Sequence, residues 1–280
     1  MRARSLIGCL AMVVAFVAVV IGLSPHEPTY QGRGLRAWLR EMQQPSPVVR
    51  QNAQEALTHL GTNAVPTLRE ILHSEDSPLK TNIIHLLSQQ RLVRIRFVPA
   101  RERRISAAIA CFVLGPRADA AIPDLFAFGA EDSYCRNLAE SALGQMGQGA
   151  VERIAYGLTN EDLNIRRTAA AALHRIDAPG TKAVALLVNC LNDRYGSIRT
   201  EAAYALSSMG ASPEILNGLT QALDDDEPGV RIAAASSLVE IGQSAIPILS
   251  NRLKTSDLQA SLRIHKVLQD IAAAEKANLQ

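Results

Sequence analysis

The feature that most constrains the fold is a pattern that repeats along the chain about every thirty residues. A basic residue begins each copy, and alanine or isoleucine follows it three positions later. A mostly leucine position comes seven residues later, and a mostly apolar position comes ten residues later. Offsets of three, seven and ten lie on one face of an α-helix, so each copy predicts an amphipathic helix. The basic residues that begin the copies are Arg50, Lys80, Arg104, Arg136, Arg166, Arg199 and Arg231.

A second helix is predicted in each copy. Glycine usually follows the last apolar residue of the first helix, which is a signal for a helix C-terminus. A second apolar stretch then begins, and in three copies proline is its second residue: Val65-Pro66, Ile122-Pro123 and Ile246-Pro247. Proline is tolerated in the first turn of a helix. Each unit is therefore expected to be two antiparallel helices, which can bury their apolar faces only when units stack.

Composition agrees with closely packed helices. Hydrophobic residues make up 48% of the chain and aromatic residues only 4%, so the apolar content is mostly Ala, Leu, Ile and Val. That mixture favours helices over a β-sandwich. The net charge of +2 requires no polyanionic partner. Four scattered cysteines without CxxC spacing predict buried small hydrophobes, not a zinc site or a disulfide framework: Cys9, Cys111, Cys135 and Cys190.

The repeat resembles the HEAT-like repeats named after phycobilisome lyases. The matching motifs are Val49-Arg50-x-x-Ala53-x-x-Ala56-Leu57-x-x-Leu60-Gly61 and Val230-Arg231-x-x-Ala234-x-x-Ser237-Leu238-x-x-Ile241-Gly242. The resemblance covers residues 47–272. It implies an all-α fold, a right-handed α-solenoid (α-α superhelix) of about seven HEAT-like helical hairpins plus a degenerate C-terminal unit around Ser261–Ile271. We therefore divide the chain into an N-terminal membrane anchor or signal segment (1–24), a linker with an N-terminal capping helix (25–46) and a HEAT-like repeat domain (47–280).

The N-terminal segment predicts a membrane anchor. Arg2 and Arg4 precede Leu6–Leu23, an uncharged stretch of 18 residues that can just span a bilayer core of about 30 Å. The stretch ends without an Ala-x-Ala site, which favours an uncleaved single-pass anchor; secretion after signal cleavage is the alternative. Basic residues flank the stretch on both sides, and the signal-like start favours repeats on the extracytoplasmic side.

A capping helix is expected directly after this segment. The motif Tyr30-x-Gly32-Arg33-x-Leu35-x-x-Trp38-Leu39 resembles the lead-in of bacterial envelope proteins in which HEAT-like repeats follow. Leu35, Trp38, Leu39 and Met42 share one helical face. We interpret this helix as a cap, with the single tryptophan covering the first repeat.

The repeat loses its period between Lys80 and Arg104. This step of 24 residues is too short for a full second helix and a loop, and its last part holds six arginines. The segment is a candidate for contact with an acidic partner, lipid headgroups or nucleic acid. The alternative is a solvated segment that pairs with acidic neighbours. A single phenylalanine argues against a stacking platform for single strands. The candidate interaction loop comprises Arg91, Arg94, Arg96, Arg101 and Arg103.

Acidic residues recur in the loop before the basic position of several units. Asp224–Glu227, Asp193, Glu161-Asp162 and Glu131-Asp132 occupy this place. Their spacing is not that of an EF-hand calcium loop. We predict instead that they cap helix N-termini and pair with the repeat arginines in a ladder between units.

Motifs for catalysis are missing from the sequence. It contains no HExxH, G-x-S-x-G or Walker A pattern. The His-Glu pairs of HEAT-like iron hydroxylases are represented only by His26-Glu27, outside the repeats. We therefore expect a membrane-tethered HEAT-repeat scaffold that binds a protein or peptide on its concave face, without enzymatic activity, cofactor, metal or nucleic acid. Two alternatives stay open: a bilin-lyase-like enzyme or enzyme subunit, and a basic-loop binder of nucleic acid or anionic lipid.

Overall fold

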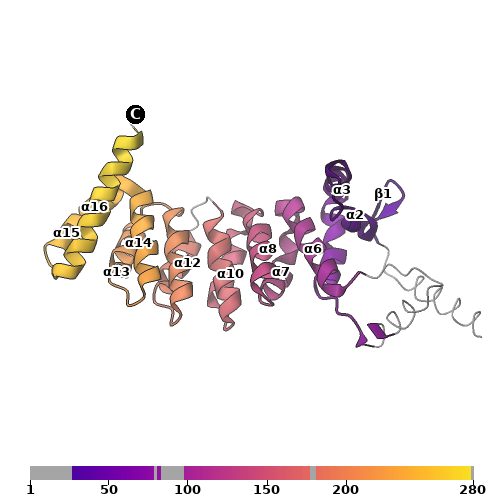
Figure 1. The fold of residues 1–280 in the computed structure, drawn as a ribbon, viewed down its shortest axis with the longest axis horizontal. Helices are drawn as coiled ribbons and strands as arrows, with labels where there is room; N and C mark the ends of the chain where they lie inside the picture. Colours follow the sequence, from indigo (N-terminus) through magenta and orange to yellow (C-terminus); the bar gives the residue numbers. More distant parts are fainter. Residues whose placement is uncertain (1–26, 79–80, 83–97, 177–180, 279–280) are drawn as a thin grey trace, which may run out of the picture.

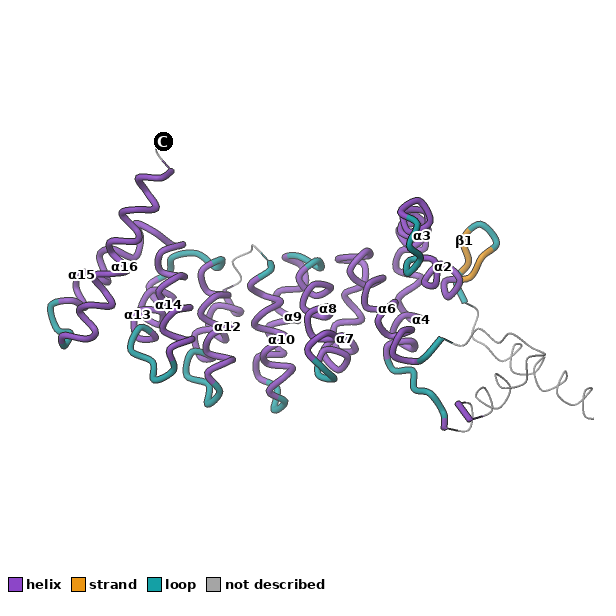
Figure 2. The backbone as a smooth tube through the Cα atoms, viewed as in Figure 1, coloured by secondary structure: helices purple, strands orange, loops and turns teal. Residues whose placement is uncertain are grey.

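A computed structural model describes residues 27–78, 81–82, 98–176 and 181–278 of the chain (Figure 1). These residues form an elongated stack of antiparallel helix pairs. Successive pairs follow one another along the long axis, from the indigo N-terminal repeat to the yellow helix at the C-terminus. Loops between helices gather along the edges of the stack (Figure 2). The predicted all-α solenoid is confirmed.

Each pair contributes one helix to each of two rows. The first-helix row consists of α3 (Pro47–Leu60), α6 (Ala100–Leu114), α8 (Ser133–Gly144), α10 (Leu163–His174), α12 (Gly196–Ser207) and α14 (Pro228–Ile241). The second-helix row consists of α4 (Val65–Leu72), α7 (Ile122–Gly129), α9 (Val151–Ala155), α11 (Thr181–Cys190), α13 (Pro213–Ala222) and α15 (Ile246–Leu253). Short 3₁₀ turns join the two helices in four of these pairs. The second helices with proline as their second residue begin at Val65, Ile122 and Ile246, as predicted.

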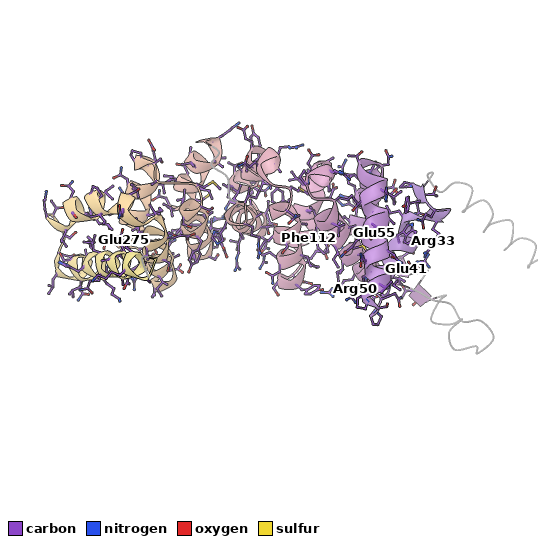
Figure 3. The ribbon with its side chains drawn as sticks, turned by 90° about the horizontal axis from the view of Figure 1, so that it is seen from above. Arg33, Glu41, Arg50, Glu55, Phe112 and Glu275 are labelled. Atoms are coloured by element: carbon purple, nitrogen blue, oxygen red, sulfur yellow. The ribbon has the colours of Figure 1, made fainter. Side chains whose placement is uncertain are left out.

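The predicted columns form the core. Consecutive first helices contact one another along the array. The alanine column has no exposed surface, which lets neighbouring helix backbones approach closely: Ala53, Ala107, Ala139, Ala169, Ala202 and Ala234. The column four residues later is equally buried and fills the space between the two rows: Leu57, Cys111, Leu143, Leu173, Leu206 and Leu238. Charged side chains of α3 lie outside, as Arg50 and Glu55 show (Figure 3). Both column predictions are confirmed for the described residues.

Glycine follows the first helix in five of the six described units, and the equivalent residue after α10, Asp177, lies outside the described residues. Gly61, Gly115, Gly147, Gly210 and Gly242 all have positive φ, between 54° and 98°. Glycine adopts this conformation without steric cost, whereas a side chain would strain it. The column therefore sets the sharp turn that sends the chain back along the stack.

The N-terminal end of the stack is closed by a small hairpin and a short helix. Strands β1 (Thr29–Tyr30) and β2 (Arg33–Gly34) pair in antiparallel fashion, and α2 (Leu35–Glu41) follows at once. Trp38 is 4% exposed, and its Nε1 donates a hydrogen bond to the Tyr30 carbonyl at 3.3 Å. Because α2 contacts both α3 and α6, its buried face shields the first repeat from water.

The irregular step in the sequence falls between α4 and α6, which contact each other directly. Most of the predicted Lys80 unit, including Ile83 and Leu87, lies outside the described residues. Six helix pairs are therefore seen in the described part of the chain. The degenerate C-terminal unit is one 21-residue helix, α16 (Leu258–Asn278), which packs on α14 and α15.

Two described stretches, Ala100–Gly129 and Pro228–Leu253, are long and apolar enough to cross a membrane by length and composition alone. Each is a helix pair of the stack, broken at Gly115 or Gly242 by positive φ. Their apolar residues contribute to the core between helices, so we interpret these stretches as helix pairs of the repeat array and not as membrane spans. The predicted anchor at Leu6–Leu23 lies outside the described residues.

Candidate interaction surface

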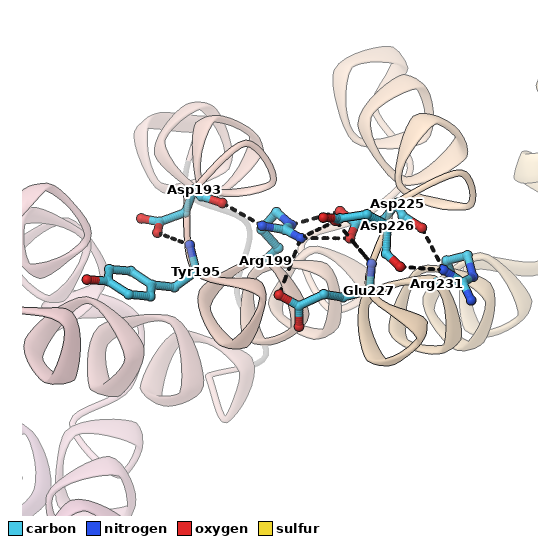
Figure 4. A network of polar contacts seen from close by, with 7 residues as sticks. All are labelled: Asp193, Tyr195, Arg199, Asp225, Asp226, Glu227 and Arg231. Carbon is cyan, nitrogen blue, oxygen red and sulfur yellow. Dashed lines mark hydrogen bonds and ion pairs between the residues drawn. The ribbon is translucent and has the colours of Figure 1, made fainter.

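The repeat arginines are bound within the stack. Arg199 shows the fullest arrangement (Figure 4): its Nε lies 2.8 Å from Asp225 Oδ2, and its terminal nitrogens reach Asp225 Oδ1 at 2.8 Å and Asp226 Oδ1 at 2.7 Å. It also donates to the Asp193 carbonyl at 2.9 Å, so one side chain ties the loop before α12 to the loop before α14. The side chains of Arg199 and Asp225 are both about 10% exposed.

The same arrangement recurs in neighbouring units. Arg166 binds Asp193 of the next unit at 2.9 Å and also the carbonyls of its own loop. Arg104 pairs with Glu131, and Arg136 donates to Asn164 at 2.8 Å. The predicted pairing of repeat arginines with loop acids is found for Arg104, Arg166 and Arg199, whereas Arg136 binds the amide of Asn164 instead. We refer to these contacts, which run from α6 to the loop before α14, as the arginine ladder.

The acidic loops also cap helices, as predicted. Asp132 accepts a hydrogen bond from the Cys135 N–H at 2.8 Å, and Asp162 accepts one from the Asn164 N–H at 2.7 Å. The backbone hydrogen bond and the neighbouring Arg101 lower the pKa of Asp132 to about 2. Burial raises the pKa of Asp225, but hydrogen bonds from Arg199 and the Glu227 N–H outweigh it and the net pKa is lowered. Asp132 and Asp225 are therefore held ionised in the folded chain.

The candidate interaction loop is only partly described. Arg91, Arg94 and Arg96 lie outside the described residues. Arg101 and Arg103 lie in the first turn of α6, because that helix begins at Ala100. Arg103 binds Asp76 at 3.1 Å, whereas Arg101 pairs with Asp132 at 2.9 Å and keeps about half of its side chain exposed. The two arginines are thus helical and paired, and only Arg101 presents much of its surface to solvent.

The three described cysteines are buried and free of disulfides. Burial raises the pKa of Cys111 to about 12 and the pKa values of Cys135 and Cys190 to about 11. Because the thiolate is the nucleophile, thiols held protonated in this way are inert. The prediction of small buried hydrophobes is confirmed for these three, and Cys9 lies outside the described residues.

A buried carboxylate that sequence reasoning missed joins α4 to α7. Asp124 is 4% exposed and lies 2.6 Å from Arg69 Nε and 2.6 Å from His73 Nε2. The partners are separated from it by more than fifty residues in the chain. The only signal in the sequence is that Asp124 stands inside an apolar stretch. That signal does not identify the residues that bind the carboxylate. The Arg69 guanidinium and the His73 ring satisfy the carboxylate, so the cluster links two repeats.

The second-helix row presents a different surface. Its exposed positions include Asn189 on α11, Asn217 and Gln221 on α13, and Asn251 on α15. Among the described residues, these four amide groups make no side-chain hydrogen bond and no ion pair. A cavity of about 290 Å³ lies between α13 and α15, and Asn217, Gln221 and Asn251 line it. We call this cavity the amide groove.

A second cavity on the same row lies between α7 and α9. It has a volume of about 450 Å³, and Pro123, Phe126 and Tyr156 line it. Tyr156 is 57% exposed, and its hydroxyl accepts a hydrogen bond from Lys182 Nζ at 2.8 Å. The row therefore offers both aromatic and amide side chains to a partner.

The amide positions recur with the period of the repeat, which is the signal that could have revealed them. Asn189, Gln221 and Asn251 are separated by 32 and 30 residues, and Tyr156 comes 33 residues before Asn189. The arginine column shows comparable steps. A search for columns that recur in the second helix would have found this row.

The fold and these columns agree with the family comparison. The sequence model for HEAT repeats matches residues 122–207 and 184–263, which together cover about half of the chain. The chain belongs to the HEAT-repeat family. No curated protein matches it.

Several solved structures are similar to this chain. The complex of CpcE and CpcF of phycocyanin lyase from Nostoc sp. PCC7120 is 25% identical, with a TM-score of 0.43 over 53% of this chain and 98% of that one. Human deoxyhypusine hydroxylase is 16% identical, with a TM-score of 0.36 over 85% of this chain and 84% of that one. A designed armadillo repeat protein in complex with peptide (KR)4 is 14% identical, with a TM-score of 0.37 over 85% and 99% of the two chains.

Proposed function

We propose that this chain is a scaffold that binds a protein partner on its second-helix row. One observation carries the proposal: the two rows use their polar side chains differently. On the first-helix row, the repeat arginines are occupied by loop carboxylates and carbonyls. On the second-helix row, amide side chains and two cavities face solvent without partners among the described residues.

The chemistry of this row suits a protein partner. Asparagine and glutamine each carry both a donor and an acceptor, so they can bind polar groups of either kind. Exposed tyrosine is enriched at protein interfaces because it offers a large apolar surface with one polar end. The α7–α9 cavity gathers no excess of positive charge that would favour a polyanion, because Arg153 pairs with Asp119. In the amide groove Arg252 pairs with Asp224, which leaves Lys254 as one positive charge among the lining residues.

A binding role without catalysis is part of this proposal. The described cysteines are protonated and buried, which removes the usual nucleophile. The described histidine closest to a buried carboxylate, His73, faces an acid that is already paired with Arg69. Lyase-like activity stays an alternative, and incubation with bilin and a phycobiliprotein would reveal it through covalent attachment of the bilin.

Membrane tethering is a further part of the proposal. Its support is the uncharged stretch Leu6–Leu23 behind Arg2 and Arg4, which is long enough to span a bilayer. The chain is then expected to stay with membranes after alkaline extraction, and removal of residues 1–24 should release it. A full-length chain that appears only in the soluble secreted fraction would favour cleavage instead.

Site-specific photocrosslinking in the native envelope tests the binding face. A crosslinker at Asn217 or Tyr156 on the second-helix row should give discrete products with a partner protein. The same group at Gln145 or Gln243, exposed where first helices end, serves as a matched control and should give weaker products or none. Equal products from all four positions, or products only from the control positions, would contradict the assignment of the face.

The basic segment is a second candidate contact. Its support is the concentration of six arginines from Arg91 to Arg104 in a chain with a net charge of only +2. Arg101 carries this proposal among the described residues, because its guanidinium is half exposed beside Asp132. Arg103 contributes less, since Asp76 and the Val98 carbonyl occupy it.

A further inference from the structure

Arg231 is the last repeat arginine, and it makes only half of the contacts that its counterparts make. Arg166 and Arg199 use Nη1 for carbonyls before their own helix, and they use Nε and Nη2 for a carboxylate of the next unit. Nη1 of Arg231 likewise donates to the Asp225 and Asp226 carbonyls, at 2.7 and 2.9 Å (Figure 4). Its Nε and Nη2 make no hydrogen bond and no ion pair among the described residues. The edge of the guanidinium that binds an acid in other units is therefore open here.

The acid expected for Arg231 is present in the chain but is used elsewhere. Asp225 follows Arg199 by 26 residues, and Asp257 follows Arg231 by the same number. Asp257 instead accepts a hydrogen bond from the Ala260 N–H at 2.8 Å, which caps the N-terminus of α16. The helix α16 thus stands where a further first helix would begin, but it brings no carboxylate to the ladder.

A cavity of about 440 Å³ lies between α14 and α16, and Arg231 is one of the residues that line it. The two other cations of its lining are satisfied, because Arg263 pairs with Asp224 and Lys266 pairs with Asp270. Arg231 is thus the one lining cation without a carboxylate in the described part of the chain. Most of the remaining lining is apolar: Leu223, Pro228, Ile232, Ala235, Leu262 and Val267.

Exposed apolar side chains extend from this cavity along α16. Ile232 of α14 and Leu262 of α16 are 62% and 58% exposed, although both line the cavity. Leu258 lies one turn before Leu262 on the same face of α16 and is 75% exposed. Large apolar side chains that gather at the surface beside polar groups are typical of protein interaction sites. A free carboxylic acid would fill the cavity and leave this rim in water, whereas a protein surface can cover both.

We infer that the cavity between α14 and α16 binds an acidic side chain of a partner protein. The carboxylate accepts hydrogen bonds from Nε and Nη2 of Arg231, in the two-bond geometry that arginine forms with carboxylates. Apolar residues next to that acid cover Ile232 and Leu262. Arg199 has the same arrangement with Asp225 and the helix that follows it, within one chain. The site lies apart from the second-helix row, so it is a contact in addition to the one proposed above.

The test titrates the full-length chain, in nanodiscs of phosphatidylcholine, with three defined probes. The acidic probe is an end-capped peptide that copies residues 223–236 of this chain, because that segment supplies the acid and the first helical turns that follow Arg199. The neutral probe carries asparagine or glutamine at each acidic position. Octanoate is the third probe, a free carboxylate with an apolar tail. Fluorescence anisotropy measures affinity, and the NMR signal of the Arg231 Nε–H, assigned by its loss in Arg231→Lys, reports contact at the site.

Two variants separate the charge from the apolar wall. Arg231→Lys keeps the charge but loses the two-bond geometry. Its matched control is Arg50→Lys, because Arg50 also donates to carbonyls before its own helix, at the other end of the array. Ile232→Ser removes part of the apolar wall without touching the ladder, and Val48→Ser, at an exposed valine of α3, is its control.

We expect the acidic probe to shift the Arg231 Nε–H signal and to bind Arg231→Lys about tenfold more weakly than the parent chain, since one of two charge-assisted hydrogen bonds is lost. Ile232→Ser should weaken binding several-fold, and both control variants should bind as the parent chain does. The neutral probe should bind about tenfold more weakly than the acidic one. Octanoate should shift the signal only at much higher concentration, because it leaves the rim uncovered.

Three results would overturn the inference. The first is an acidic probe that leaves the Arg231 Nε–H signal unchanged. The second is equal affinity of that probe for the parent chain and Ile232→Ser, or for Arg231→Lys and Arg50→Lys. The third is octanoate that acts at the same concentration as the peptide, which would make the ligand a free carboxylic acid. If Arg231→Lys does not fold, the signal in the parent chain and the Ile232→Ser affinity decide. Photocrosslinks from Asn217 and Tyr156 do not depend on this cavity, so the two proposals fail separately.

Discussion

The edge that carries the arginine ladder and the second-helix row come from the same repeat, yet they use polar side chains in opposite ways. Arg166 and Arg199 each bind a carboxylate of the next unit and a carbonyl before their own helix. Asn189 and Gln221 recur with the same period, but their side-chain amides make no hydrogen bond among the described residues. A recurring polar column can thus either hold repeats together or stay open to a partner. Only the partners of each side chain distinguish the two roles.

Asp124 shows that the rows are not uniform. It belongs to a second helix, but it is buried and bound by Arg69 and His73. The open character of the second-helix row therefore lies toward the C-terminal repeats, where Asn217, Gln221 and Asn251 are found. This difference can be tested by substitutions that separate core, ladder and row.

The largest effect is expected in the core that both rows share. Leu206→Asp places a charge at a position with no exposed surface, which should destabilise the stack by about 4 kcal/mol or more. Thermal and urea unfolding of the variant measure this loss. Ser197→Asp, at an exposed position on the same helix, is the control and should change stability little. Unchanged unfolding of Leu206→Asp would show that the column is not core.

A smaller but clear loss is expected in the arginine ladder. Arg199→Met leaves Asp225 nearly buried without its cation, which should cost about 2–4 kcal/mol. The double variant Arg199→Met with Asp225→Leu should recover much of that loss, because no charge stays unpaired. Arg194→Met, which removes an arginine that lies over the Tyr195 ring, is the control. The urea concentrations at half unfolding of these variants measure the effect. A double variant that is no more stable than Arg199→Met would argue against the pair.

A pH-dependent effect is expected at Asp132. Its folded pKa of about 2 lies below the ordinary aspartate value of about 3.9, so its contribution to stability is complete above pH 4 and disappears as the pH falls from 4 to 2. Asp132→Asn keeps an acceptor for the Cys135 N–H but cannot titrate. Urea midpoints of the variant should therefore fall less steeply over this range. Parallel acid curves for both proteins would refute the assignment.

The basic segment should matter for binding more than for folding. Replacement of Arg94, Arg96 and Arg101 with Gln should weaken contact with an anionic partner, and added salt should have the same effect. The stability change at Arg101 should be small, since the pair with Asp132 is exposed and screened by solvent. Arg103→Gln is the contrast, because it removes the bond to Asp76. A large stability loss from the triple variant would show that these arginines are structural.

The smallest effect on stability is expected on the second-helix row itself. Asn217→Ala, Gln221→Ala and Asn251→Ala should each change the free energy of unfolding by no more than about 0.5 kcal/mol, because they remove no internal contact. Urea unfolding of the three single variants measures this. A loss of more than about 1 kcal/mol in the free energy of unfolding at any of them would show that this amide stabilises the fold, as the ladder arginines do.

Much of the architecture follows from the sequence alone, for a local reason. The period of the apolar residues, the glycine that takes positive φ and the proline in the first turn all act between residues close in the chain. That is why the repeat pattern by itself places Leu206 in the core and Gly242 at a helix end, where both are found. The ladder could also be anticipated, because its acids and arginines recur with the same period.

What the tertiary structure decided is which distant groups meet. Asp124 binds Arg69 and His73, which are more than fifty residues away in the chain. Arg103 binds Asp76 of the same chain. The amide groove exists only because α13 and α15 pack so that Asn217, Gln221 and Asn251 line one cavity. A repeat pattern specifies which faces of its helices are apolar. The distance and rotation between successive helix pairs, which side-chain packing sets, determine which polar groups are paired and which stay free to bind.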